Sequence, residues 1–178
     1  VKVQKHMAVF VKALTIWTGK QTASLVFDSD IDEFTATGFF DKVKNKPNIA
    51  GVCFTTNGDV FGVCFSVAVT EMDSALKDPN VFAFSFESHG RCFTPKMFIL
   101  NSVVKWKETV CMCTDEQHRN HGFMRVSNTE VGGELFFGNS THQPFCHNIR
   151  KCFDGLDDTT LTRSVFYKCV RFLAVQLE

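Results

Sequence analysis

The fold is decided by the stretch from residue 49 to residue 70, which reads IAGVCFTTNGDVFGVCFSVAVT. Two apolar runs, 49–55 and 60–70, flank the polar segment 56–59, which contains Asn57 and Gly58. Asn-Gly between two apolar runs is the strongest short-range signal for a hairpin, because both residues accept the positive φ that the tight turn requires. We therefore predict two antiparallel strands over 49–55 and 60–70, joined at residues 56–59.

Alternation along these strands predicts which side chains share a face. The second strand of the hairpin places large residues on one face, namely Phe61, Val63, Phe65, Val67 and Val69. A further strand over 81–87 repeats the pattern with Phe82, Phe84 and Phe86. A face of large apolar side chains backed by small ones is typical of a sheet with a packed interior. We expect the core between two sheets to hold Phe61, Phe65, Phe82, Phe84 and Phe86.

Outward from the hairpin, the sequence predicts further strands and two helices. The strands are expected over 23–27, 92–100, 109–114, 122–127, 134–137 and 166–177, with 109–114 and 122–127 at sheet edges. A first helix is expected over 8–17, because Phe10, Ala13, Leu14 and Trp17 follow the 3,4 spacing of a helix with one apolar face. A second helix is expected to begin at Ser29 or Asp30 and to end before Pro47, and a short helix or turn is expected over 147–153.

These elements predict a mainly β (α+β) fold, a sandwich of two antiparallel sheets flanked by short helices. The length of 178 residues suits one domain, which we place at 8–178 after an N-terminal extension at 1–7. The hydrophobic fraction of 44% excludes a disordered or fibrous chain. The chain contains 20 Phe and one Tyr, an unusual excess of the aromatic residue that has no polar group.

Charge and cysteine content restrict the function classes. The 19 basic and 19 acidic residues give zero net charge, which excludes the basic footprint of a dedicated nucleic-acid binder. No apolar run approaches the roughly 18 residues of a membrane-spanning helix. Several of the 8 cysteines lie inside apolar runs, so we expect a cytoplasmic protein with reduced thiols. The sequon at Asn139 would matter only in a secreted chain.

The best metal-like cluster is Cys111 and Cys113 with His118 and His121. Cys111 and Cys113 share a face of the predicted strand, and the two histidines could complete a tetrahedral zinc site. The spacing differs from that of a ββα zinc finger, and two thiols beside a polar loop is the more ordinary interpretation. A thiol-redox or zinc-binding protein that uses this cluster is the alternative function. A weaker second group is His142, Cys146, His147 and Cys152.

Other candidate functional residues are better interpreted as having structural roles. Asp28, Asp30 and Asp32 resemble the start of a calcium loop, but that loop requires Gly and Glu at the positions held here by Glu33 and Phe39. His89 near Cys92 is interpreted as an exposed turn residue, and the basic run 42–46 as a solvated helix end. No nucleophile motif or phosphate-binding glycine loop is present. We therefore assign no catalytic residue, no cofactor and no metal site.

The order of motifs resembles the TLDc domain (TBC, LysM, domain catalytic), the module of the oxidation resistance proteins. The segments that carry the resemblance are 17–20, 25–29, 57–62 with Ser66, 78–86, 132–139, 157–161 and 174–178. Among the family motif positions, Gly62, Ser66, Gly132 and Gly133 are interpreted as structural residues for close backbone approach and turns. The chain departs from animal members in having no Trp after Trp106, and its segment 101–131 matches poorly.

The resemblance implies a fold and a function. It implies a sandwich of two antiparallel sheets with flanking helices, protection against oxidative stress, and a protein partner, which in animal members is the vacuolar proton-pumping ATPase. The family has no accepted active site, so the resemblance implies a non-catalytic protein-interaction module. Neither the resemblance nor the residues predict an oligomeric state.

Overall fold

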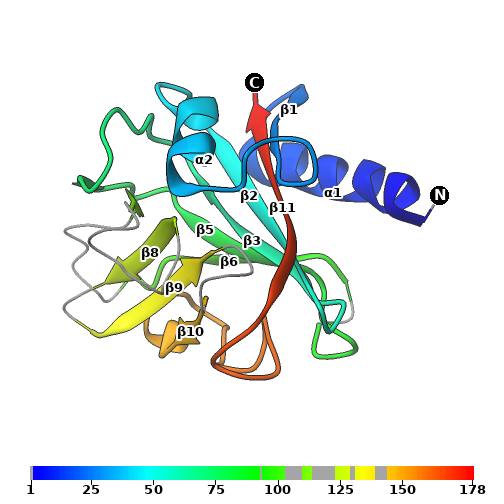
Figure 1. Cartoon of the computed structure of the whole chain (residues 1–178). Coiled ribbons are helices and arrows are strands. Elements are labelled where there is room, and N and C mark those ends of the chain that lie inside the picture. The colour runs from blue at the N-terminus through cyan, green and yellow to red at the C-terminus, as the bar shows by residue number, and fades with distance from the viewer. Residues whose placement is uncertain (1, 93, 103–109, 114–122, 129–130, 139–143) are drawn as a thin grey trace.

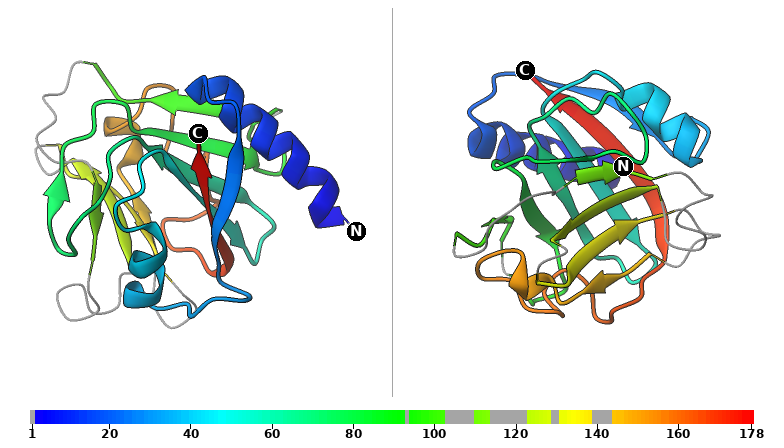
Figure 2. Two further views of the ribbon diagram at one scale, coloured as in Figure 1. Left: turned by 90° about the horizontal axis from the view of Figure 1, so that it is seen from above. Right: turned by 90° about the vertical axis from the view of Figure 1, so that its left-hand side faces the viewer.

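The computed structural model describes residues 2–92, 94–102, 110–113, 123–128, 131–138 and 144–178. Sheet A has six strands in the order β1 (Ala23–Asp28), β11 (Cys169–Leu177), β2 (Ile49–Thr55), β3 (Val60–Phe65), β5 (Phe82–Glu87), β6 (Lys96–Ile99). Sheet B has five strands in the order β10 (Cys146–His147), β9 (Gly133–Phe137), β8 (Met124–Asn128), β7 (Val110–Met112), β4 (Ala75–Leu76). All strand pairs are antiparallel. The predicted two-sheet sandwich with short helices is confirmed (Figures 1 and 2).

The predicted hairpin is present, although its second strand is shorter than expected. Ile49 pairs with Phe65 and Phe54 with Val60, so the turn falls on residues 55–59 as the Asn-Gly signal indicated. The prediction that the second strand continues to Thr70 is wrong. After Phe65 the backbone leaves the sheet, because the Ser66 N–H donates to the buried Asp78 carboxylate at 2.5 Å.

The core between the two sheets is rich in phenylalanine. Phe61 and Phe65 face this core, as predicted, together with Phe137 of sheet B and Phe172 of β11. The ring of Phe172 packs at centroid distances of 5.0 to 6.4 Å from four others, those of Phe34, Phe39, Phe123 and Phe137. Tyr167 is also buried here and uses its hydroxyl to donate to the Phe136 carbonyl.

The expected position of Phe82, Phe84 and Phe86 between the sheets is wrong. These rings lie on the opposite face of sheet A, in a second core beneath α1 (Lys2–Thr18), where Phe86 stacks on Phe10 at 4.2 Å. The pairing of β3 with β5 explains the difference, because Gly62 stands opposite Phe84. Neighbouring strands thus place large side chains on opposite faces, each beside a small residue of the other strand.

The helices follow the predicted apolar faces but begin elsewhere. α1 begins at Lys2 instead of residue 8, and it buries Phe10 and Leu14 against sheet A. The prediction that Ser29 or Asp30 caps the second helix is wrong, because α2 (Ala36–Val43) is capped by Thr35, whose hydroxyl accepts from the Gly38 N–H at 3.1 Å. Between β1 and α2 the chain turns instead, with the Asp32 N–H bonded to the Asp28 carbonyl.

The remaining strands differ in position or length from several of the predictions. The predicted edge positions for the strands near 109–114 and 122–127 are wrong, because β7 and β8 both lie inside sheet B. The strand expected over 92–100 is reduced to Lys96–Ile99, and the short strands β4 and β10 were not predicted. β11 and the 3₁₀ turn η1 (Ile149–Lys151) fall within the predicted segments, whereas β9 begins one residue before its predicted start at Glu134. In the described part of the chain, no helix combines the length and apolar character needed to cross a membrane.

Candidate functional site

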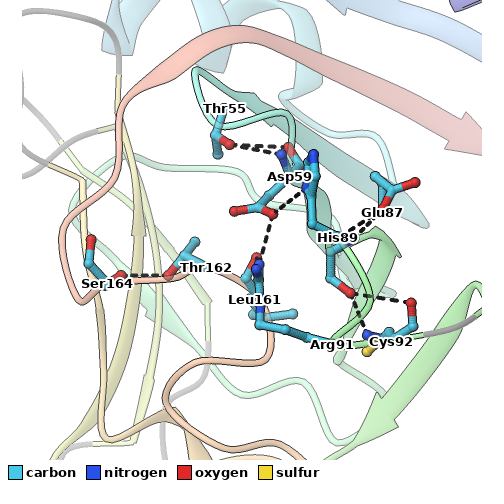
Figure 3. Close-up of polar contacts among 10 residues, drawn as sticks. Thr55, Asp59, Glu87, His89, Arg91, Cys92, Leu161, Thr162 and Ser164 are labelled. Carbon is cyan, nitrogen blue, oxygen red and sulfur yellow. Dashed lines mark hydrogen bonds and ion pairs between the residues drawn. The ribbon is translucent and has the colours of Figure 1, made fainter.

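A polar network joins three separate chain segments at the end of sheet A where β11 begins (Figure 3). At its centre is Asp59, in the turn between β2 and β3, which is only 1% exposed. Arg91 Nη2 donates to Asp59 Oδ1 at 2.7 Å, and His89 Nδ1 lies 3.2 Å from the same oxygen. One buried carboxylate oxygen therefore holds two side chains from the connection between β5 and β6.

Local hydrogen bonds position Asp59. The Thr55 hydroxyl accepts from the Asp59 N–H at 3.1 Å, and the Asp59 carbonyl accepts from the Thr55 N–H at 3.0 Å. Gly58 takes a φ of +79°, the conformation for which glycine is the preferred residue in a tight turn. The Asn-Gly turn that makes the hairpin thus also places the carboxylate at the end of the sheet.

The turn after β5 positions His89 and Arg91. His89 itself adopts a φ of +51°, and Glu87 Oε1 accepts from the backbone N–H groups of Ser88 and His89. The His89 side chain is 41% exposed and its ring lies over Gly58, where an added Cβ would come within 2.9 Å of His89 Cε1. The predicted exposed turn residue is therefore confirmed, with a buried acidic partner that the sequence did not indicate.

A third segment, residues 161–166, completes this end of the molecule. Arg91 Nη2 also contacts the Leu161 carbonyl at 3.4 Å, and the Thr162 hydroxyl donates to the Ser164 carbonyl at 2.6 Å. The Cys146 N–H donates to the Val165 carbonyl, which ties the segment to sheet B. We call His89, Arg91 and the exposed residues 163–166 the hairpin-end surface.

The chemistry of this network is electrostatic. A carboxylate on His Nδ1 is the arrangement that orients a histidine base in hydrolases. Among the described residues, however, no serine, threonine or cysteine side chain forms a hydrogen bond with His89. Asp59 Oδ1 is in addition shared with the Arg91 guanidinium. The network fixes the relative positions of three loops and presents His89 at the surface, with Arg91 partly exposed beside it.

The structure brings together the two cysteines of the predicted thiol cluster. Cys111 and Cys113 lie on the same face with their sulfur atoms 3.8 Å apart, and both are buried against Phe136. His118 and His121 lie outside the described residues. Within the described part of the chain, no three histidine, cysteine or acidic residues converge as a metal site.

Burial makes several of the thiols weak nucleophiles. All 8 cysteines are free, and 7 of them are buried. Burial raises the pKa of Cys64 to about 12 and raises the pKa values of Cys53 and Cys146. The hydrogen bond with Cys111, together with burial, raises the pKa of Cys113. Since the thiolate is the reactive form, these environments oppose thiol chemistry at neutral pH.

The remaining sequence candidates do not form sites. Asp28 is paired with Arg171, with Arg171 Nη2 2.6 Å from Asp28 Oδ2, and this hydrogen bond holds the pKa of Asp28 below its usual value. Cys146 and Cys152 are buried whereas His147 is exposed, and His142 and the sequon at 139–141 lie outside the described residues. In the basic run, Lys42 pairs with Asp32 at 2.7 Å.

The four motif positions of the resemblance have structural roles in the folded chain. A Cβ at Gly62 would lie 1.9 Å from the Gly51 carbonyl oxygen, and one at Gly133 would lie 2.3 Å from Cys152 Sγ. Gly132 adopts a φ of +68° in the turn before β9. The Ser66 hydroxyl donates to Asp78 Oδ1 at 2.8 Å. Close approach explains two of these glycines and a turn explains the third.

Comparison with known proteins does not assign a family. No protein-family model matches the chain, and no curated protein matches it.

Sequence reasoning missed the network of Asp59 and Arg91. His89 was considered beside Cys92, its neighbour in sequence, whereas its partner Asp59 is 30 positions away. One available signal was that the turn before β3 and the turn after β5 meet when these strands pair antiparallel. An acidic residue in one turn and basic residues in the other then face each other.

We expect Asp59→Asn to lower the free energy of unfolding by about 1 to 3 kcal/mol, because a buried hydrogen bond to a charged group is lost. Asparagine keeps the size of the side chain but removes the charge that holds Arg91. Urea unfolding followed by circular dichroism measures the change. The control is Asp41→Asn, on an exposed position of α2, which is expected to change stability by less than about 0.5 kcal/mol. Equal stability of the two variants would contradict a stabilising network.

Proposed function

We propose that the chain is a non-catalytic protein-interaction module of the TLDc type. In this proposal it acts in protection against oxidative stress and binds the vacuolar proton-pumping ATPase. The resemblance of the sequence motifs suggests the family and the partner. The two-sheet sandwich is compatible with that family, and the buried thiols weigh against the redox alternative.

The observation that carries the interaction role is the hairpin-end surface. Phe166 is 53% exposed, and it is flanked by Val165 and by the exposed Arg163. Aromatic and arginine side chains are enriched among the residues that dominate binding energy at protein interfaces.

The segment that presents Phe166 is held by contacts on both sides. The Phe166 ring lies 6.3 Å from that of Phe145, and these two residues form an isolated β-bridge. The Tyr167 N–H donates to the Pro144 carbonyl. A fixed loop loses little conformational entropy on binding, so its exposed apolar residues contribute more of their area to affinity.

The test is recovery of pump subunits from a cell lysate by the immobilised full chain, quantified by mass spectrometry. We expect pump subunits to be enriched by the wild-type chain and reduced at least fivefold with Phe166→Ser. The control is Ile31→Ser, which removes an 81% exposed apolar side chain outside the hairpin-end surface and is expected to leave recovery unchanged. Failure of the wild-type chain to enrich any pump subunit would overturn the proposed partner. Equal recovery by the Phe166 variant would overturn the proposed surface.

A further inference from the structure

The other end of sheet A carries a hollow that the proposed function does not use. This hollow has a volume of about 540 Å³, and we call it the Trp17 pocket. Its lining includes Trp17 in the last turn of α1, Lys20 just after that helix, and Phe82 and Met97 of sheet A. Ser66, directly after β3, and Asn80, before β5, also line it. Pockets for small molecules commonly enclose about 300 to 1,000 Å³ and combine an apolar lining with a few polar groups.

The apolar part of the lining suits an aromatic ring. Trp17 is only half-buried, although its ring packs edge-to-face on Phe82 with centroids 6.2 Å apart. Met97 is also half-buried, and Ile99 is 55% exposed at the rim. Aromatic rings gain energy from edge and face contacts with other rings, and methionine sulfur contacts ring edges favourably.

The charge of the pocket lining indicates which group a bound aromatic ring would carry. Lys20 is the charged residue of this lining and is half-buried. Among the described residues, no acidic side chain forms an ion pair with it. An ammonium group without an acidic partner at the edge of an apolar hollow can donate charge-assisted hydrogen bonds to an anionic ligand.

Asp78, the buried acidic residue near the rim, is not an ion-pair partner of Lys20. Asp78 is fully buried, and its oxygens accept from the backbone N–H groups of Ser66, Val67 and Asn80 and from the Ser66 hydroxyl. These bonds stabilise its charge locally. They also fix the rim, because the Asn80 side-chain amide in turn donates to the Ser66 hydroxyl at 3.3 Å.

A second hollow provides a contrast. It has a volume of about 430 Å³ and lies between α1 and the strands β1 and β11, with Met7, Val11 and Leu25 in its lining. Its charged residue is Arg171, which is already paired with Asp28 and Asp30. Of these two hollows, the Trp17 pocket is therefore the one that combines an apolar lining with a cation that has no acidic partner among the described residues.

We propose that the Trp17 pocket binds a small aromatic anion, with its ring against Trp17, Phe82 and Met97 and its anionic group on Lys20. This binding is independent of the proposed function, because the pocket and the hairpin-end surface lie at opposite ends of sheet A. The ligand class is a compact ring bearing one carboxylate or sulfonate.

The test is an NMR titration of the full chain with three probes that share one ring, namely 2-naphthoate, 2-naphthalenemethanol and 2-naphthylmethylammonium. We expect 2-naphthoate to shift the Trp17 indole N–H and the Lys20 amide saturably. We expect the alcohol to bind at least fivefold more weakly and the ammonium compound not to saturate. Equal affinity for all three probes, no saturable shift with any probe, or shifts confined to Met7, Val11 and Leu25 would each overturn the proposal.

Two variants and a control locate the site. Lys20→Met keeps the apolar stem and removes the charge, and we expect it to weaken 2-naphthoate binding about tenfold while binding of the alcohol is unchanged. Ile99→Asp adds a carboxylate at the exposed rim and is expected to abolish 2-naphthoate binding. Lys12→Met, on an exposed position of α1 outside the pocket, is expected to leave the affinity unchanged. Unchanged affinity in both pocket variants would overturn the proposal.

Discussion

Replacing Gly62 with alanine is expected to lower the free energy of unfolding by more than about 3 kcal/mol, because the central strands cannot accept a methyl group there. The added Cβ would lie 1.9 Å from the Gly51 carbonyl oxygen and 2.6 Å from Phe84 Cζ. The first contact is with the backbone of the paired strand β2, which cannot move without disturbing the register. Relief would therefore require separation of β2 from β3 or displacement of Phe84.

The measurement is urea unfolding followed by far-ultraviolet circular dichroism. Gly132→Ala is the matched control, since its Cβ would have nothing within 4 Å and only the φ of +68° opposes it. A left-handed backbone costs an alanine about 1 to 2 kcal/mol, so the control should be clearly more stable than Gly62→Ala. A Gly62→Ala protein as stable as the control would show that the sheet relaxes at this point. The close-approach role of Gly62 would then be wrong.

Local chemistry explains which features of the fold the sequence could predict. The hairpin at 49–65 has a local signal, because Asn57 and Gly58 are adjacent in sequence and Gly58 supplies the positive φ of the turn. Alternation correctly grouped Phe82, Phe84 and Phe86 on one face. It could not determine whether that face meets α1 or sheet B, because both layers are apolar. The position of α1 is a tertiary property with no local signal.

The candidate site was less predictable for the same reason. Asp59 was recognised only as a turn residue, and its role depends on two turns that meet when β3 pairs with β5. The α2 cap shows a related limit. Ser29, Asp30 and Thr35 are all good capping residues, and the choice of Thr35 follows from tertiary contacts. The Ser29 hydroxyl instead accepts from the Phe172 N–H of β11 at 2.9 Å.

Replacing Phe172 with alanine is expected to lower the free energy of unfolding by about 3 to 5 kcal/mol, the range for removal of a buried phenylalanine ring. Phe172 is fully buried in the core between the sheets, and four other rings pack around it. Phe39 lies in α2 and Phe34 just before it, whereas Phe123 directly precedes β8 and Phe137 is the last residue of β9. Surrounding elements that are fixed by separate strand pairings cannot all collapse into the space left behind.

Phe166→Ala provides the matched control, because the same atoms are removed from a side chain that is 53% exposed. We expect this control to lose less than about 1 kcal/mol, since surface substitutions usually have small effects. Phe172→Leu retains most of the apolar volume and is expected to fall between the two, which keeps the test informative if the alanine variant fails to fold. Urea unfolding of the three proteins measures the order. Equal losses in Phe172→Leu and Phe166→Ala would contradict a central role for Phe172, because its ring would then contribute no more than a surface ring.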